Sequence, residues 1–291
     1  MRYSEALLVR SLDPLDDPVE IFFAESRLAH SDGAQPAEVE EEQFITMLVS
    51  FDPDASQRWA ARAFAATFIT AQCGFRQVPR GHQLDSWLDI FLSERRPASL
   101  CIVFSLPEYS TVTSQQVSNL LTGLKAANYH HVQLTVAVSA NPVDWEHCNG
   151  IDGFVAAENR RKDLVALQVF GMMSALMAPG ITYCIDAEDL RPVFGSAAHP
   201  AQVASGVFHD DEFKTSAEVI LKLETSRSVA LMPAAPMRLD AQNVLKRSLE
   251  KLTPPNTEFV MVTPYDMQSI PLLMEEVVLV SLLVGGLPYF N

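Results

Sequence analysis

The chain has 291 residues, a net charge of −15 and a sequence pI near 4.8, and 48% of its residues are hydrophobic. Such a chain is typical of globular proteins that bury one large core or two medium-sized ones. The acidic charge argues against a nucleic-acid-binding protein and against attachment to an anionic membrane, because both need a basic surface.

The cysteines indicate a reducing compartment. Four of them occur at wide, irregular spacings without a C-x-x-C motif: Cys73, Cys101, Cys148 and Cys184. This pattern favours reduced thiols in a cytoplasmic protein over a disulfide framework. The N-terminus carries charges and no long apolar core, and the last apolar run, 277–287, is too short to cross a membrane. We therefore expect no signal peptide and no integral membrane segment.

Residues 1–43 differ in composition from the rest of the chain. Asp, Glu and Pro are concentrated on both sides of one apolar piece at 19–29. We interpret this segment as an acidic N-terminal arm that holds one strand or helix.

Short apolar runs alternate with helical patterns in residues 44–160. Strands are predicted at 44–51, 99–106, 132–140 and 151–157, and helices at 57–71, 84–92 and 114–127. This alternation is typical of βαβ units, so we predict an α/β domain with a mostly parallel, Rossmann-like sheet.

The centre of the chain carries its strongest pattern, because Leu164 to Met177 contains no charged residue. A helix with one wet face would show an apolar stripe, so this helix is predicted to be buried on every side, between two α/β layers. Pro179 and Gly180 give its stop signal, and we assign 161–179 to a central helix.

Residues 180–291 are predicted to form a second, smaller α/β domain. Strands are expected at 201–209, 228–236, 257–264 and 275–286, and helices at 187–194, at 211–224 with Asp210 as the N-cap, and at 239–252.

Five segments of the second half carry a recognisable order of motifs: LTVAVSANPVDWE (134–146), IDGFVAAENRR (151–161), VFGMMSALMAPG (169–180), ITYCIDAEDLRPVFG (181–195) and AQVASGVF (201–208). In this order they resemble five parts of the FtsZ/tubulin family. These are a strand with its proline-bearing loop, the strand before the central helix, the end of that helix, the loop with the catalytic acids, and the next strand. The resemblance implies an FtsZ/tubulin-like fold, with a nucleotide-binding-like domain, a central helix and a C-terminal domain built on a mixed four-stranded sheet.

The first half differs from the family at the loops that bind the nucleotide phosphates in that family. In the family, two glycine-rich loops let backbone N–H groups reach the nucleotide phosphates. Both loops have other residues here: Asp52, Pro53 and Asp54 after the first strand, and Pro107 and Glu108 after the second. Carboxylates repel a polyphosphate and proline removes a donor. We therefore predict that the phosphate site is lost.

A few positions still match the family's functional residues. Asp163 falls where the family reads the guanine base, although it is also a first-turn carboxylate that the helix dipole favours. Asp186 and Asp189 match the two loop acids, which in the family enter the next subunit's pocket and orient the attacking water. Cys184 stands where the family has Asn. Asp186 could instead cap the helix that follows it.

Other candidate residues carry weaker signals. His147 and Cys148 suggest a Cys–His pair, but adjacent side chains rarely point at each other and no third group orients them. The pair His130 and His131 is interpreted as a surface turn, and His199 as part of a solvated strand end. We predict no metal site and no nucleophilic site.

The sequence thus favours a non-enzymatic, FtsZ-like pseudo-GTPase without a cofactor. It would act as a scaffold or regulator through protein–protein contacts, with itself or with an FtsZ-like filament. A more specific form of this hypothesis is that Asp186 and Asp189 enter the GTP-occupied pocket of a partner protein and assist GTP hydrolysis there. The alternative is a nucleotide- or metal-responsive switch, or a GTPase with atypical loops, in which Asp52 and Asp54 hold a divalent cation. A third interpretation is an α/β protein that shares only the strand–helix rhythm with the family.

Overall fold

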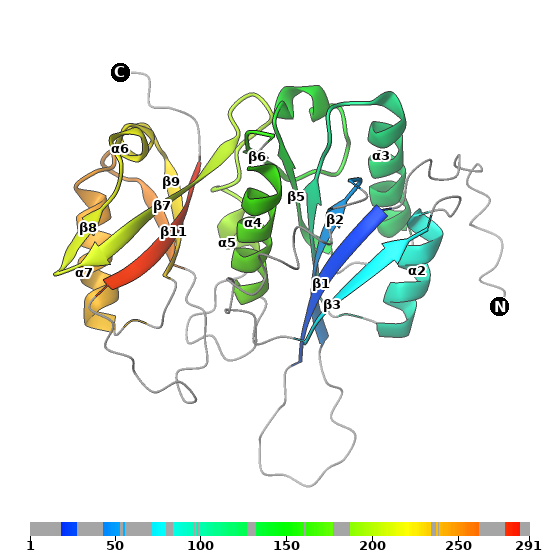
Figure 1. Ribbon diagram of the computed structural model, residues 1–291, viewed down its shortest axis with the longest axis horizontal. Coiled ribbons are helices and arrows are strands. Elements are labelled where there is room, and N and C mark those ends of the chain that lie inside the picture. The colour runs from blue at the N-terminus through cyan, green and yellow to red at the C-terminus, as the bar shows by residue number, and fades with distance from the viewer. Residues whose placement is uncertain are drawn as a thin grey trace, which may run out of the picture.

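The computed structural model describes residues 19–27, 43–52, 55, 72–79, 84–95, 97, 99–126, 132–159, 161–176, 187–233, 237, 239–261 and 277–285. These residues form one 11-stranded sheet with helices on both of its faces (Figure 1). None of the helices in these ranges is both long and apolar enough to cross a membrane.

Within the described ranges, the N-terminal half contains six strands and two regular helices ahead of the central helix. Its strands are β1 (Val19–Arg27), β2 (Gln43–Ser50), β3 (Gln72–Val78), β4 (Ser99–Ser105), β5 (Val132–Ser139) and β6 (Gly153–Ala156), and its helices are α2 (Leu84–Arg95) and α3 (Thr111–Ala126). Strands β2, β4, β5 and β6 are parallel neighbours in that order. This confirms the predicted mostly parallel sheet. The helix predicted at 57–71 lies outside the described residues.

Strand β1 belongs to the sheet and lies next to its edge strand, β3. It pairs antiparallel with β2 on one side and with β3 on the other. The apolar piece predicted within the acidic arm is therefore a strand of the domain, and the boundary placed at residue 43 separates two neighbouring strands. Strand β3 was not predicted, because QCGFRQV has a glycine and an arginine where an alternating pattern would continue.

The central helix, α4 (Lys162–Leu176), covers one face of the parallel strands. It packs with Phe22, Leu48 and Val136, whereas alternate residues of the same strands face α2 and α3 on the other side. Most of α4 is buried, as predicted. The prediction was wrong at Leu164, which lies in the first turn of the helix and is 41% exposed.

The C-terminal half extends the same sheet. It contains α5 (Ala187–Leu190), β7 (Ala201–His209), β8 (Glu212–Lys214), α6 (Ala217–Leu223), β9 (Ser228–Pro233), α7 (Leu239–Glu250), β10 (Glu258–Met261) and β11 (Val277–Gly285). The full order is β10-β9-β11-β7-β6-β5-β4-β2-β1-β3, with β8 paired to β7. The four strands β10, β9, β11 and β7 form the predicted mixed sheet.

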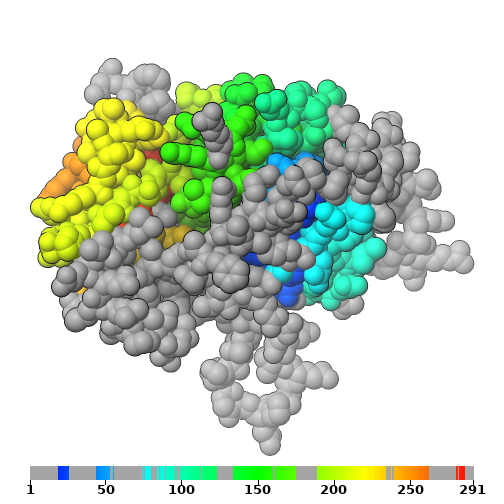
Figure 2. Space-filling view, viewed as in Figure 1, coloured from blue at the N-terminus to red at the C-terminus, as the bar shows by residue number. Residues whose placement is uncertain are grey.

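A short parallel pairing joins the two halves of the sheet. Val155 of β6 pairs with Ala201 of β7, and Ala156 with Gln202. Figure 2 shows the C-terminal elements, in yellow and orange, directly beside the green central segment. The two predicted α/β units therefore share one continuous sheet.

The helix predicted at 211–224 is shorter than expected. Asp210 and Asp211 adopt φ values of 50° and 60° and form the turn between β7 and β8. Helix α6 starts at Ala217, and the side chain of Ser216 caps it by accepting a hydrogen bond from Val219 N. Asp210 is a turn residue because Asp tolerates the left-handed conformation that such hairpin turns require.

Cys101 provides a test of the packing between β4 and α4. Its side chain is fully buried there, and burial raises the pKa of the thiol from its ordinary value of 9.0 to about 12. We expect iodoacetamide to leave Cys101 unmodified in folded protein at pH 8.5 and to modify it in denaturant, as measured by peptide mass spectrometry. This thiol's contribution to stability is complete below about pH 9 and declines as the pH rises toward 12. Rapid alkylation of folded protein at this position would contradict the packing.

Candidate functional site

The candidate site is the edge of the sheet at which the parallel strands β2, β4, β5 and β6 end. Ligands of open α/β sheets bind at this carboxyl edge, because the loops of neighbouring strands meet there. Asp52, Pro107 and Glu108 follow β2 and β4, and Asp163 lies in the first turn of α4, shortly after β6. The structure thus brings these predicted residues to one edge. Two further predicted residues, Pro53 and Asp54, lie outside the described part of the chain.

Backbone amides that follow the strands are hydrogen-bonded within the chain itself. Asp52 N donates to Ser50 Oγ at 3.1 Å, and Asn141 N donates to Ser139 Oγ at 3.2 Å. Leu106 N donates to the carbonyl oxygen of Val138 at 2.9 Å. The Leu106 bond continues the ladder between β4 and β5, whereas Asp52 N and Asn141 N are donors beyond the strand ends that serine side chains of the protein engage.

The start of α3, which follows the loop after β4, is capped in the same way. Ser110 Oγ accepts from Thr113 N at 3.0 Å, and Ser110 O accepts from Ser114 N at 3.0 Å. Pro107, three residues earlier, has no N–H to offer. A phosphate-binding helix start needs its first amides directed at the anion, and here a serine side chain takes one of them.

Carboxylates surround this edge. Glu108, Asp144, Glu146 and Glu158 are exposed on the loops after β4, β5 and β6. Asp52 is half-buried after β2. A polyphosphate would meet negative charge from all four loops, and Coulomb repulsion opposes its binding.

A cluster of polar and aromatic side chains joins the loop after β5 to the start of α3. Ser114 Oγ lies 2.9 Å from His147 Nε2 and 3.2 Å from Cys148 Sγ, and Tyr109 Oη lies 3.2 Å from the same His147 nitrogen. The Tyr109 ring also contacts Trp145 edge-on, with 5.4 Å between ring centroids. His147 is exposed and Cys148 is buried, so the two side chains diverge and meet only through Ser114. Ser114 is only 5% exposed, and through it the cluster connects the loop after β5 to the start of α3.

Three exposed apolar side chains lie in the segments that follow the same strands. Tyr109 follows β4 and is 41% exposed, Val143 follows β5 and is 58% exposed, and Leu164 follows β6 and is 41% exposed. Val143 lies in the short 3₁₀ helix η1 (Pro142–Trp145), which the buried Trp145 anchors. The strands β4, β5 and β6 are adjacent in the sheet, and each of these three residues, the apolar trio, follows one of them.

The chain was also compared with known proteins. No protein-family model matches it, and no curated protein matches it by sequence. Among solved structures, it is similar to a point mutant of FtsZ from M. jannaschii, with 12% identity over 69% of each chain and a TM-score of 0.46. It is also similar to an empty FtsZ dimer from M. jannaschii, with 12% identity over 69% of this chain and 67% of that chain and a TM-score of 0.42. At this identity the similarity concerns the fold alone.

The second set of predicted residues lies away from the carboxyl edge. Asp189 is exposed on α5, and Arg191, just after this helix, forms a 2.6 Å ion pair with Asp152. The other carboxylate oxygen of Asp152 accepts from Thr135 N, in the first half of β5, at 2.8 Å. Asp152 directly precedes β6, so α5 lies near the amino end of that strand. Asp189 and the carboxyl-edge residues therefore belong to different surfaces of one chain. The remaining predicted loop residues, Cys184 and Asp186, lie outside the described part of the chain.

Sequence reasoning missed the apolar trio and Ser114. The segments PEYS and NPVDWE place apolar or aromatic residues among polar ones, which is a usable signal only once both loops are known to share an edge. Ser114 gave no signal, because a serine in the first turn of a helix is ordinary.

Proposed function

We propose that this protein is an FtsZ-like pseudo-GTPase that acts through protein–protein contacts and does not use GTP. The observation that carries the proposal is the carboxyl edge of the parallel sheet. There the chain engages its own amides, has a proline in the loop after β4 and presents exposed carboxylates. A nucleotide triphosphate needs the opposite, which is free amide donors and positive charge.

The same edge carries features of a protein-binding surface. The apolar trio is exposed on this edge, and so are Glu108, Asp144, Glu146 and Glu158 on the segments that follow the same strands. We take these four carboxylates as the acidic rim of the surface. Interfaces of this kind combine aromatic and aliphatic contacts with a charged rim that selects the partner. The fitting partner is a protein with an apolar patch inside a basic rim.

The charge on this edge also bears on self-association. Two copies that met through this face would bring acidic rims together, and such like-charge contacts weaken association. We therefore infer that the carboxyl edge contacts a different protein surface and that it does not form a symmetric pair with itself.

Sedimentation velocity tests this function. We expect the full chain to sediment identically without nucleotide, with GTP and with GDP, each in magnesium, because its assembly does not depend on a bound phosphate. Assembly that requires GTP would contradict the proposal. A shift produced by magnesium alone, and lost in the Asp52→Asn/Asp54→Asn variant, would instead favour a metal-responsive switch.

A further inference from the structure

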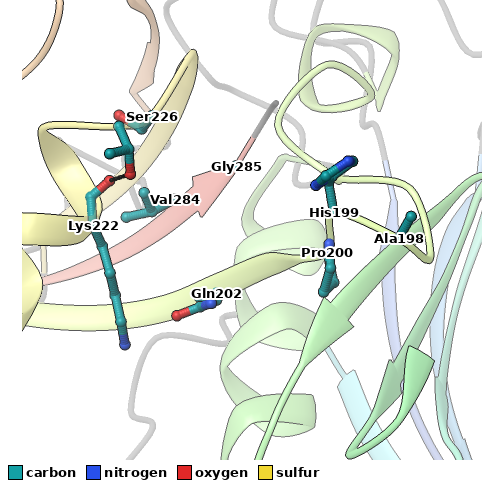
Figure 3. Close-up of a pocket in the computed structure, with 9 residues that line it drawn as sticks. Ala198, His199, Pro200, Gln202, Lys222, Ser226, Val284 and Gly285 are labelled. Atoms are coloured by element: carbon teal, nitrogen blue, oxygen red, sulfur yellow. Dashed lines mark hydrogen bonds between the residues drawn. The ribbon is translucent and has the colours of Figure 1, made fainter. Parts of the chain in front are cut away.

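A pocket lies in the C-terminal half of the sheet, where β7 begins and β11 ends (Figure 3). Its volume is about 280 Å³, and its walls are formed by Ala198, His199, Pro200, Gln202, Lys222, Thr225, Ser226, Val284 and Gly285. These residues come from the loop before β7, from β7 itself, from the end of α6 and from the end of β11. Nothing in the proposed function uses this pocket.

The walls of the pocket are held in place by their own contacts. Ser226 Oγ donates to Leu223 O at 2.9 Å, and His199 N donates to Ser196 O at 3.1 Å. Gly285 packs so closely against Val193 that an added Cβ would lie 1.7 Å from the Val193 carbonyl oxygen. The cavity is therefore formed without a ligand, as small-molecule sites usually are.

Three nitrogen-bearing side chains contribute to this lining. Figure 3 shows the Gln202 amide between Lys222 on one side and His199 and Pro200 on the other. In the part of the chain that the structure describes, the Gln202 amide and the His199 ring have no side-chain hydrogen-bond partner. Lys222 Nζ forms an ion pair with Glu218 Oε1 at 2.8 Å, and the Glu218 side chain is 77% exposed.

The charge of this lining is opposite to that of the protein. The chain carries a net charge of −15, yet the ionisable side chains that line the pocket are Lys222 and His199, and none of the nine lining residues is acidic. The hydroxyl groups of Thr225 and Ser226 already donate to carbonyls of α6. The donors that remain for a ligand are those of Lys222, Gln202 and His199.

We propose that this pocket binds a small anion that carries phosphate or carboxylate groups. An ammonium, an amide N–H and an imidazole N–H are donors that recognise such oxygens. The volume is slightly below the usual range of roughly 300–1,000 Å³ for drug-sized ligands, which restricts the ligand to a small metabolite. Glu218 competes for Lys222 in the empty pocket, but an exposed ion pair of this kind is weak, so a bound anion can replace it.

Isothermal titration of the full chain with inorganic pyrophosphate and, separately, with citrate tests the proposal. We expect saturable binding of at least one of them, and the one that binds identifies phosphate or carboxylate as the recognised group. Lys222→Met should weaken this binding about tenfold. Glu218→Gln should strengthen it about twofold, because it removes the competing carboxylate.

Lys222→Met and Glu218→Gln should change anion binding in opposite directions, which distinguishes a role of Lys222 in ligand binding from a role in stabilising α6. If the ion pair only stabilised α6, both variants would act in the same direction. The matched control is Lys246→Met on α7, which breaks a comparable i,i+4 pair with Glu250 and should leave binding unchanged. The proposal is overturned if both probes fail to bind, or if Lys222→Met and Lys246→Met have equal effects.

Discussion

Phe170→Ala is expected to lower the free energy of unfolding by about 3–5 kcal/mol, the usual cost of emptying a buried aromatic position. Phe170 is fully buried in the middle of α4, and the centroid of its ring lies 4.9 Å from the ring centroid of Phe22 in β1. The substitution would open a cavity between the central helix and a strand that only the structure places in the sheet. Urea unfolding followed by circular dichroism measures the change.

Leu164→Ala in the same helix is the matched control. Leu164 is 41% exposed, so its truncation should change stability by less than about 1 kcal/mol. Phe170→Leu should fall between the two variants, because it keeps part of the buried volume. Similar losses for Phe170→Ala and Leu164→Ala would contradict the orientation of α4 on the sheet.

A photo-crosslinking amino acid at position 143 is expected to capture a partner protein, whereas the same amino acid at position 239 is not. The two sites are matched, because Val143 is 58% exposed and Leu239 is 57% exposed, both as apolar side chains. They differ in location, since Val143 stands in the apolar trio and Leu239 begins α7 in the C-terminal half. The experiment is made in the native cells, with the full chain.

Reversing the charge of rim residues tests whether the expected partner contact at the carboxyl edge depends on the acidic rim. Glu108→Lys combined with Glu146→Lys should reduce the crosslinked product at position 143 at least tenfold, because the rim would then repel a basic partner. Glu250→Lys on α7 should not reduce it. Equal product from positions 143 and 239, or product that does not respond to the rim charges, would contradict a specific contact at the carboxyl edge.

Much of the fold could be predicted from the sequence because many of its helices and strands have a recognisable pattern in their own residues. The runs 99–106 and 132–140 are mostly apolar and carry no charged residue, as buried parallel strands do, and they correspond to β4 and β5. Leu164 to Met177 lacks charge, and it became the buried central helix. These patterns depend only on neighbouring residues.

The remainder of the fold depended on pairing between distant segments. Strand β1 is placed by its partners β2 and β3, and nothing in its own nine residues specifies a position between two strands over one at the edge of the sheet. Asp210 resembled a helix cap, but its φ of 50° belongs to a hairpin turn that β7 and β8 create together. Sequence reasoning has no access to such pairing before the topology is known.

The candidate site also has one part that could be predicted from the sequence and one part that could not. The residue types that disfavour a phosphate site, such as Pro107 and Glu108, could be identified from the sequence, because missing glycines and added carboxylates are visible there. The hydrogen bond from Thr113 N to Ser110 Oγ could not be predicted from the sequence. Neither could the contacts of His147 and Cys148 with Ser114. These contacts join loops that follow different strands.

The most direct test of the central claim is isothermal titration of the purified full chain with GTP and with GDP, in magnesium, at high micromolar protein concentration. We expect no saturable heat from either nucleotide, because the amides at the carboxyl edge are already engaged and its loops carry carboxylates. Saturable binding of GTP that weakens when Asp163 is changed to Ala would contradict this account and would establish a working nucleotide site in spite of the missing glycines.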